Sequence, residues 1–249
     1  MKKNNLILGA FLAITAILFS SCGASSSSDS TSTEKVEGST ESTSTEKVEG
    51  STDRTESGGV VTIGTQVWTS QNLDVAIYRN GDVIPQVQDK QAWAKLTTGA
   101  WCYYDNDASN GTKYGKLYNW YAVHDPRGLA PNGYHIPTDA EWTQLSDYLG
   151  EESEAGTKMK STSGWVGNGN GSNSSGFSGL PGGYRNDGIE YNLQSRGTFY
   201  NFGNYGSWWS STEASAYNAW YRSLKDYNGD VYRNGLNKRY GFSVRCLRD

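Results

Sequence analysis

The stretch YHIPTDAEW, residues 134–142, decides the fold because it contains a well-formed helix start. Thr138 is a good N-cap, and Glu141 stands three residues later, which completes the pattern of a capping box. Gly150 is a stop signal. Between them the apolar residues recur at helical spacing: Ala140, Trp142, Leu145, Tyr148 and Leu149. The pattern predicts a main helix over about residues 138–149, and one such helix among turns and aromatic strand patterns indicates an α+β domain.

Residues 1–21 have the pattern of a signal peptide. Lys2 and Lys3 precede an apolar run of 14 residues, Leu6–Phe19, which is too short for a stable membrane span. Small residues follow, as in a bacterial lipobox, and they predict that Cys22 is lipidated and becomes the first mature residue. An ordinary cleaved signal with an incidental cysteine is the alternative. Lipidation implies an anchor in the outer membrane, with the rest of the chain at the cell surface or facing the periplasm.

Residues 22–59 have the composition of a tether. A 12-residue unit occurs twice, as Ser30–Glu41 and Ser42–Asp53, and only its last residue differs. Each unit holds a single valine and no aromatic residue, so the segment cannot bury a core and is expected to be disordered. A solvated spacer is the simplest interpretation, and a binding tail or glycosylated stalk is the alternative.

Residues 60–249 form one domain of ordinary size with almost no net charge. The chain has 26 acids and 22 bases, and eight acids and five bases precede residue 60, so the domain keeps 18 acids and 17 bases. This balance argues against nucleic acid as a partner. All 17 tyrosines and all nine tryptophans lie in this domain, so aromatic rings must supply much of its core.

Turn residues divide the domain into short strands. Gly64-Thr65 predicts a first hairpin, and Asn228-Gly229 is the strongest hairpin signal in the chain. Asp89 is a candidate cap for a short helix. We expect further strands, a second short helix and one long loop at the following positions: strands at 100–104, 116–123, 207–212 and 241–248, the helix at 154–160, and the loop at 167–179.

Several motifs carry a resemblance to a known family: VTIGTQVWTSQNLDV (61–75), YRNGDVIP (78–85), YGKLYNWYAV (114–123), DPRGLAPNGYHIPTDAEW (125–142), LPGGYRN (180–186), WWSSTE (208–213) and GFSVRC (241–246). Residues 60–249 closely resemble the Fibrobacter succinogenes major paralogous domain, found mostly in surface lipoproteins. HIPTDAEW and GFSVRC are more distantly similar to segments of formylglycine-generating enzymes and C-type lectin-like folds. The resemblance implies a C-type lectin-like α+β fold with paired terminal strands, but no reaction.

Cys102 and Cys246 are the two cysteines of the domain. An even pair in an exported protein predicts a disulfide, and two buried thiols are the alternative. Similarity to the formylglycine-generating enzymes would imply a copper-binding cysteine pair. No second cysteine stands close to either residue, so we expect no such site and no cofactor.

The sequence predicts no metal site and no catalytic constellation, and a calcium ion in one of the loops, with no ligands that can be named, is the alternative. The chain has only His124, which we expect to be exposed, and His135, which we expect to pack at the start of the main helix. Asp105 begins a string that resembles a calcium loop, but its twelfth position is Lys116 where a bidentate glutamate is needed. The Glu-Pro-Asn motif of calcium-dependent lectins is replaced by Ala-Pro-Asn at residues 130–132. No nucleophile stands on a strained elbow.

The sequence favours a non-catalytic surface module that binds a polysaccharide, a surface glycoconjugate or a surface protein. Planar tyrosine and tryptophan rings on a rigid scaffold suit stacking on sugar faces. The alternatives are an enzyme on a formylglycine-generating scaffold and a structural or adhesion protein without a small ligand. The candidate binding residues, expected on loops and at a hairpin tip, are Tyr184, Arg185, Asn186, Tyr200, Tyr205 and Tyr227.

Overall fold

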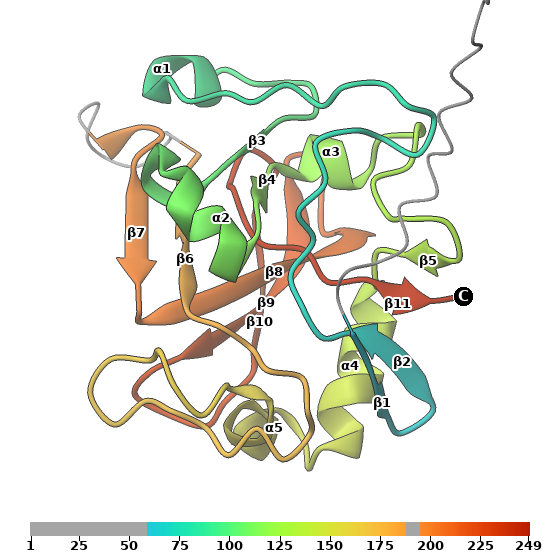
Figure 1. Ribbon diagram of the computed structural model, residues 1–249, viewed down its shortest axis with the longest axis vertical. Helices are drawn as coiled ribbons and strands as arrows, with labels where there is room; N and C mark the ends of the chain where they lie inside the picture. The colour runs from blue at the N-terminus through green and yellow to red at the C-terminus, as the bar shows by residue number, and fades with distance from the viewer. Residues whose placement is uncertain (1–58, 188–194) are drawn as a thin grey trace, which may run out of the picture. The chain divides into compact units, whose positions relative to one another are not determined.

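A computed structural model describes residues 59–187 and 195–249 (Figure 1). The predicted signal peptide, the predicted lipidation site Cys22 and nearly all of the predicted tether lie outside the described residues. The described part is an α+β domain, as predicted, with two main sheets and short helices. Within it, no helix has the length and apolar character needed to cross a membrane.

The smaller main sheet joins the two ends of the domain. Its strands stand in the order β1 (Val60–Ile63), β2 (Gln66–Thr69), β11 (Leu247–Arg248) and β5 (Tyr134–His135). The hairpin β1–β2 turns at Gly64-Thr65 as predicted, and Gly64 has a φ of 62°, which favours glycine. Trp68 of β2 pairs with Leu247 of β11, so the N-terminal hairpin is held by the last strand (Figure 1).

The larger sheet carries most of the C-terminal half. Its order is β10 (Tyr232–Asn237), β9 (Asn218–Lys225), β8 (Tyr205–Glu213), β6 (Gly182–Arg185) and β7 (Phe199–Phe202). Strand β6 runs parallel to β8, and every other neighbouring pair is antiparallel. The predicted Asn228-Gly229 signal lies between β9 and β10, which pair along six residues.

The main helix is α4 (Asp139–Tyr148), and its start is the predicted capping box. The Thr138 side chain accepts from the Glu141 amide, and the Glu141 carboxylate accepts from the Thr138 amide. Two other predicted helices are confirmed within a few residues. They are α1 (Lys90–Trp93), capped by Asp89, and α5 (Glu152–Met159).

The larger sheet separates two aromatic cores. Trp208 and Trp209 are neighbours on β8, are both fully buried, and point to opposite faces because side chains alternate along a strand. Trp208 packs with Trp142, Phe177 and the residues under α4 and α5. Trp209 packs with Phe242 in the second core. Tryptophan and phenylalanine rings therefore carry the centre of the domain, as the composition predicts.

Some predicted strands are much shorter than expected. Only Trp101–Cys102 (β3) and Leu117–Tyr118 (β4) pair, and residues 241–248 form only isolated bridges before β11. A 3-10 turn η1 (Tyr104–Asn106) and helix α2 (Ala108–Tyr114) follow β3, and helix α3 (Trp120–Val123) follows β4. The reason is local capping, because the Asp107 and Asn119 side chains accept from amides at the starts of α2 and α3.

The disulfide prediction is wrong, and the alternative of two buried thiols is what the structure contains. Cys102 lies on β3 in a small cluster with Trp93 and Leu117. Cys246 belongs to the core around Phe242, and its amide and carbonyl bond to Thr69 at the edge of β2. Cys102 on β3 and Cys246 just before β11 thus belong to different packing clusters.

Candidate functional site

Tyrosines gather on one face of the larger sheet. Six of them are half-buried or exposed there, and together they define what we call the tyrosine surface: Tyr184, Tyr200, Tyr205, Tyr221, Tyr227 and Tyr232. Four of the six were predicted as binding residues. The structure places the six tyrosines on strands and on the β9–β10 connection, whereas the sequence analysis expected loops and a hairpin tip.

Strand register brings the first four rings together. Tyr184 of β6 lies opposite Tyr200 of β7, and their ring centroids are 5.9 Å apart. Tyr184 also contacts Phe242 at 5.9 Å, and Phe242 contacts Tyr221 at 4.7 Å. The Tyr221 phenol in turn interacts electrostatically with that of Tyr205. The rings of Tyr200, Tyr184, Phe242 and Tyr221 therefore form a row across the sheet, and Tyr205 lies on the same face beside Lys225.

The other end of the tyrosine surface is built around the ammonium group of Lys225. This Nζ lies 3.5 Å from the ring centroid of Tyr232, 5.3 Å from that of Tyr205 and 5.6 Å from that of Tyr227. Tyr205 is paired directly with Lys225 across β8 and β9. The Tyr232 hydroxyl accepts from Asn228 Nδ2 at 2.6 Å, so the hairpin loop is tied to the same group.

The hydroxyl of Tyr227 interacts electrostatically with the ammonium group of Lys225. A hydrogen-bond interaction with Lys225 lowers the pKa of Tyr227, whose side chain is 64% exposed. Burial alone would lower the pKa of Lys225, but its interaction with Tyr227 and the neighbouring phenols raises it. Burial raises the pKa of Tyr221 to about 12. At neutral pH the group is therefore one positive charge among phenol hydroxyls, which is suited to sugar hydroxyls and to anions.

The prediction that two of the candidate binding residues are exposed is wrong. Arg185 and Asn186 follow Tyr184 on and after β6, and both are fully buried. Arg185 donates to the carbonyls of Gly197, Val87 and Gln88 at 2.7–2.8 Å, which fixes the strand against a neighbouring loop. Its guanidinium also lies over the rings of Trp93 and Phe199. The burial of Arg185 and Asn186 could not be predicted from their position next to Tyr184, because it depends on segments almost a hundred residues away.

Sequence reasoning missed Tyr221, Lys225 and Tyr232. The signal was present in AWYRSLKDY, residues 219–227, where Tyr221 and Lys225 stand four apart on a strand and so share a face. Tyr232 then joins them because it pairs with Ser223, which lies between them on that same face.

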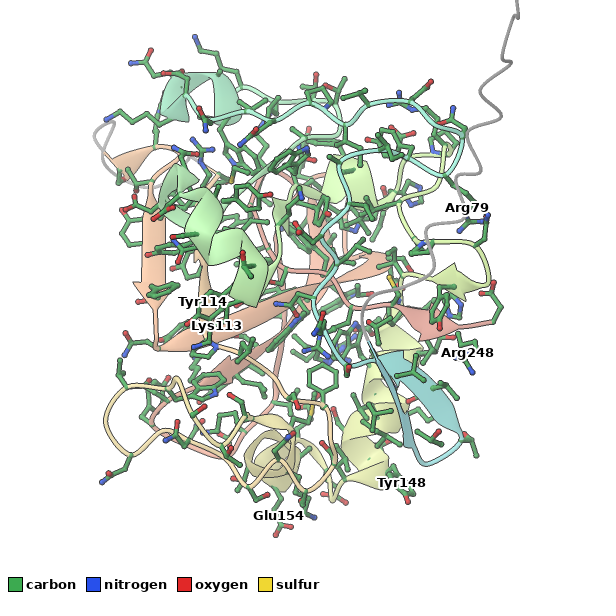
Figure 2. The ribbon with its side chains drawn as sticks, viewed as in Figure 1. Arg79, Lys113, Tyr114, Tyr148, Glu154 and Arg248 are labelled. Carbon is green, nitrogen blue, oxygen red and sulfur yellow. The ribbon has the colours of Figure 1, made fainter. Side chains whose placement is uncertain are left out.

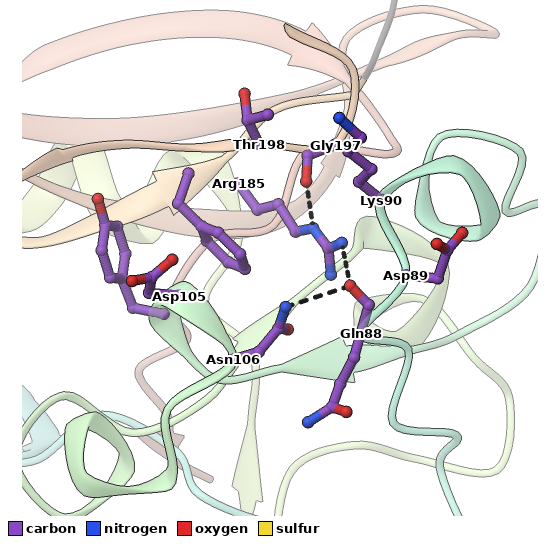
Figure 3. A pocket seen from close by; sticks show the side chains of 10 residues that line it. Gln88, Asp89, Lys90, Asp105, Asn106, Arg185, Gly197 and Thr198 are labelled. Carbon is purple, nitrogen blue, oxygen red and sulfur yellow. Dashed lines mark hydrogen bonds between the residues drawn. The ribbon is translucent and has the colours of Figure 1, made fainter. Parts of the chain in front are cut away.

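A shallow cleft of about 610 Å³ lies at the buried end of β6 (Figure 3). Arg185 and Gly197 form its inner side, and Gln88 and Asn106 face them, with Asn106 Nδ2 donating to the Gln88 carbonyl at 3.2 Å. Asp105 and Asn106 both have φ near 55°, an uncommon conformation for residues other than glycine. The Oδ1 atom of Asn106 is buried without a hydrogen-bond partner. The cleft is open, and its lining mixes polar and apolar groups.

No group of three or more His, Cys, Asp or Glu side chains that could hold a metal ion is found in residues 59–187 and 195–249. His124 is exposed, as predicted, and its ring stacks on Trp120 at 4.5 Å. His135 is only partly buried and contacts the carboxylates of Glu141 and Asp249. Its predicted place beside the main helix is confirmed.

The fold and the tyrosine surface together define an α+β domain with a half-exposed aromatic sheet face. Residues 61–248 match the Fibrobacter succinogenes major domain, so the chain belongs to that family. The match spans both sheets, both aromatic cores and the entire tyrosine surface. A comparison with proteins of curated function gives no match.

Proposed function

We propose that this protein is a cell-envelope lipoprotein whose domain binds a polysaccharide or surface glycoconjugate without catalysis. The main observation in support of the proposal is the tyrosine surface, a group of six half-buried or exposed tyrosines on one sheet face. Tyrosine rings supply a flat apolar surface for sugar rings, and their hydroxyls supply donors and acceptors at the rim. Membership of a family consistent with surface proteins supports the same proposal.

The rigidity of the tyrosine surface supports specific binding rather than non-specific adsorption. Tyr184 is held between Tyr200, Tyr240 and Phe242, with ring centroids 5.9 Å away in each case. Rings that are fixed before a ligand arrives lose little side-chain entropy on binding. The shallow, open geometry suits contact with a chain of sugars. We therefore expect dissociation constants of about micromolar to millimolar, near −8 to −4 kcal/mol.

The proposal includes a C-type lectin-like arrangement of the domain and an anchor at Cys22. The pairing of β2 with β11 brings the ends of the domain together, as the C-type lectin-like arrangement requires. The repeat segment before residue 60 supplies the tether. Replacing Cys22 with Ser should abolish labelling by a palmitate analogue and release the protein from the membrane fraction. Labelling that persists in this variant would refute lipidation.

The binding proposal is tested with a broad glycan array and two variants. Tyr184→Ala and Tyr227→Ala remove rings from opposite ends of the tyrosine surface, and each should weaken binding. Tyr227→Ala should leave the melting temperature nearly unchanged because the ring is exposed. Tyr217→Ala is the matched control, since Tyr217 is 77% exposed and is not part of the tyrosine surface. An array without any signal, or equal binding by all variants, would overturn the proposal. In the first case, a protein partner recovered by cross-linking on cells would favour adhesion.

A further inference from the structure

The Lys225 ammonium group has an unusual set of neighbours. Its ring contacts are to Tyr205, Tyr227 and Tyr232, and its polar interaction is with the Tyr227 hydroxyl. The side chain is half-buried, so it is positioned by these rings and still reaches solvent. An ammonium group has three donor hydrogens, so it can bind a ligand while it keeps its contacts with the rings.

Several buried cations of the domain are instead paired with a carboxylate or bonded to backbone carbonyls. Arg222 pairs with Asp139, and Lys238 pairs with Glu213 at 2.6 Å. The fully buried guanidinium of Arg245 donates to the carbonyls of Thr69, Phe177 and Ser178. Among residues 59–187 and 195–249, no carboxylate forms an ion pair with Lys225, and its ring contacts are to tyrosines.

The aspartates next to this group are already engaged by side-chain amides. Asp226 Oδ2 accepts from Asn204 Nδ2 at 3.0 Å, and Asp230 Oδ2 accepts from Asn228 Nδ2 at 2.7 Å. A second ammonium, that of the buried Lys160, donates to the carbonyls of Lys225 and Asn228 from beneath the loop. These bonds hold the loop in a fixed shape, and the outward ammonium of Lys225 remains the charged group between the tyrosine rings.

We propose that the Lys225 end of the tyrosine surface is a subsite for an acidic sugar, in which the ammonium group binds a carboxylate or sulfate. The rings of Tyr205, Tyr227 and Tyr232 would contact the sugar around that anion. Hydrogen bonds to a charged group are stronger than those between neutral groups, and partial burial of Lys225 limits screening. This inference rests on the proposed glycan-binding function and narrows its ligand class to anionic polysaccharides.

The test uses pairs of polymers that differ only in charge. Polygalacturonate is compared with its methyl ester for carboxylates, and dextran sulfate with dextran for sulfates. Affinity gel electrophoresis at low and at physiological ionic strength gives the dissociation constants for the full chain. We expect one acidic polymer to bind about tenfold more tightly than its neutral counterpart. We also expect Lys225→Met to abolish this difference and Lys225→Arg to retain most of it.

Lys95→Met is the matched control because it removes the same charge from an exposed site outside the tyrosine surface. Lys95→Met should leave the preference for the acidic polymer intact. Equal losses of this preference in the two Met variants would show a general attraction to polyanions and would overturn the subsite. Thermal melting of Lys225→Met checks that it folds, and Lys225→Arg provides the second measurement if it does not. Neutral glycans bound through Tyr184, with no effect of Lys225→Met or Lys225→Arg, would refute the subsite and leave the proposed function standing. No binding to any acidic or neutral glycan would refute both.

Discussion

Arg222 Nη1 donates to Asp139 Oδ1 over 2.7 Å, which joins the middle of β9 to the first residue of α4. The Arg222 side chain is 1% exposed, and it also donates to the Asp139 carbonyl and to Thr143 Oγ1. Arg233 of β10 binds the same carboxylate from the solvent side. Asp139 thus compensates a buried charge and lies at the helix N-terminus, where a carboxylate is favourable.

Replacing Asp139 with Asn should lower the free energy of unfolding by about 3 kcal/mol, because a buried guanidinium loses its counter-charge. The measurement is urea denaturation followed by tryptophan fluorescence. Arg233→Ala is the control and should cost less than about 1 kcal/mol, since this side chain is 37% exposed. Equal losses in the two variants would contradict the assignment of Arg222 as the partner that matters.

The Asp139 carboxylate should also make the free energy of unfolding depend on pH in the acid range. Burial alone would raise the pKa of Asp139, but hydrogen bonds from Arg233 and Arg222 outweigh it, and the pKa is lowered. Its stabilising contribution is therefore complete above the ordinary aspartate pKa of about 3.9 and is lost as pH falls through the lower folded value. Asp139→Asn should consequently lose less stability than the wild type over this acid range.

Trp142 should be one of the most costly residues to truncate. Its indole is fully buried against Trp68, Phe177 and Trp208. Trp142→Ala should cost roughly 3–5 kcal/mol in denaturant unfolding. Trp142→Phe should cost less, because it retains a ring and also removes the Nε1 group, which has no hydrogen-bond partner.

Tyr148 provides the control on the same helix. Figure 2 shows it at the outer side of α4, and it is 66% exposed beside the β1–β2 turn. Tyr148→Ala should cost less than about 1 kcal/mol. A loss below about 1 kcal/mol for Trp142→Ala as well would show that the buried face of the helix is misassigned.

The predictable parts of the fold rest on local chemistry. Thr138 and Glu141 set the start of α4, and Asn228-Gly229 sets the β9–β10 hairpin, because caps and tight turns depend on residues a few positions apart. The strand lengths around Cys102 were overpredicted because capping by Asp107 and Asn119 competes with strand pairing.

The tyrosine surface was predictable only in part, because its two ends depend on long-range pairing. Tyr184 and Tyr200 were predicted as candidate binding residues because they are aromatic. That they lie on the same face of the sheet follows from the pairing of β6 with β7. The structural role of Arg185 was missed because its partners Val87 and Gln88 lie 98 and 97 residues away. Composition thus predicts the kind of surface, while register decides which residues form it.

His135 should make stability depend on pH near neutrality. Burial alone would lower its pKa, but contacts of Nδ1 with Asp249 at 2.7 Å and of Nε2 with Glu141 at 3.0 Å raise it. The resulting stabilisation is complete below the ordinary histidine pKa of about 6.5 and is lost as pH rises through the higher folded value.

Melting temperatures of the wild type and of His135→Gln, measured from about pH 5.5 to pH 8.5, test this. The difference between the two proteins should be largest at the acidic end and shrink toward the alkaline end. His124→Gln, an exposed site whose ring contacts Trp120, should leave the wild-type profile in place. A difference that is constant with pH would show that the His135 contacts do not contribute through charge.

Cys102 and Cys246 should behave as protected thiols. Burial raises the pKa of Cys102 to about 11 in spite of the nearby Arg185, so the thiol stays protonated and reacts slowly in the folded protein. Alkylation in denaturant without reductant should modify both residues, as read by peptide mapping. A reductant should also leave the unfolding free energy unchanged, whereas a bridge across 144 residues would contribute up to about 5 kcal/mol. A linked pair of Cys102 and Cys246 peptides, together with a loss of stability on reduction, would contradict the separate packing of these thiols in two clusters.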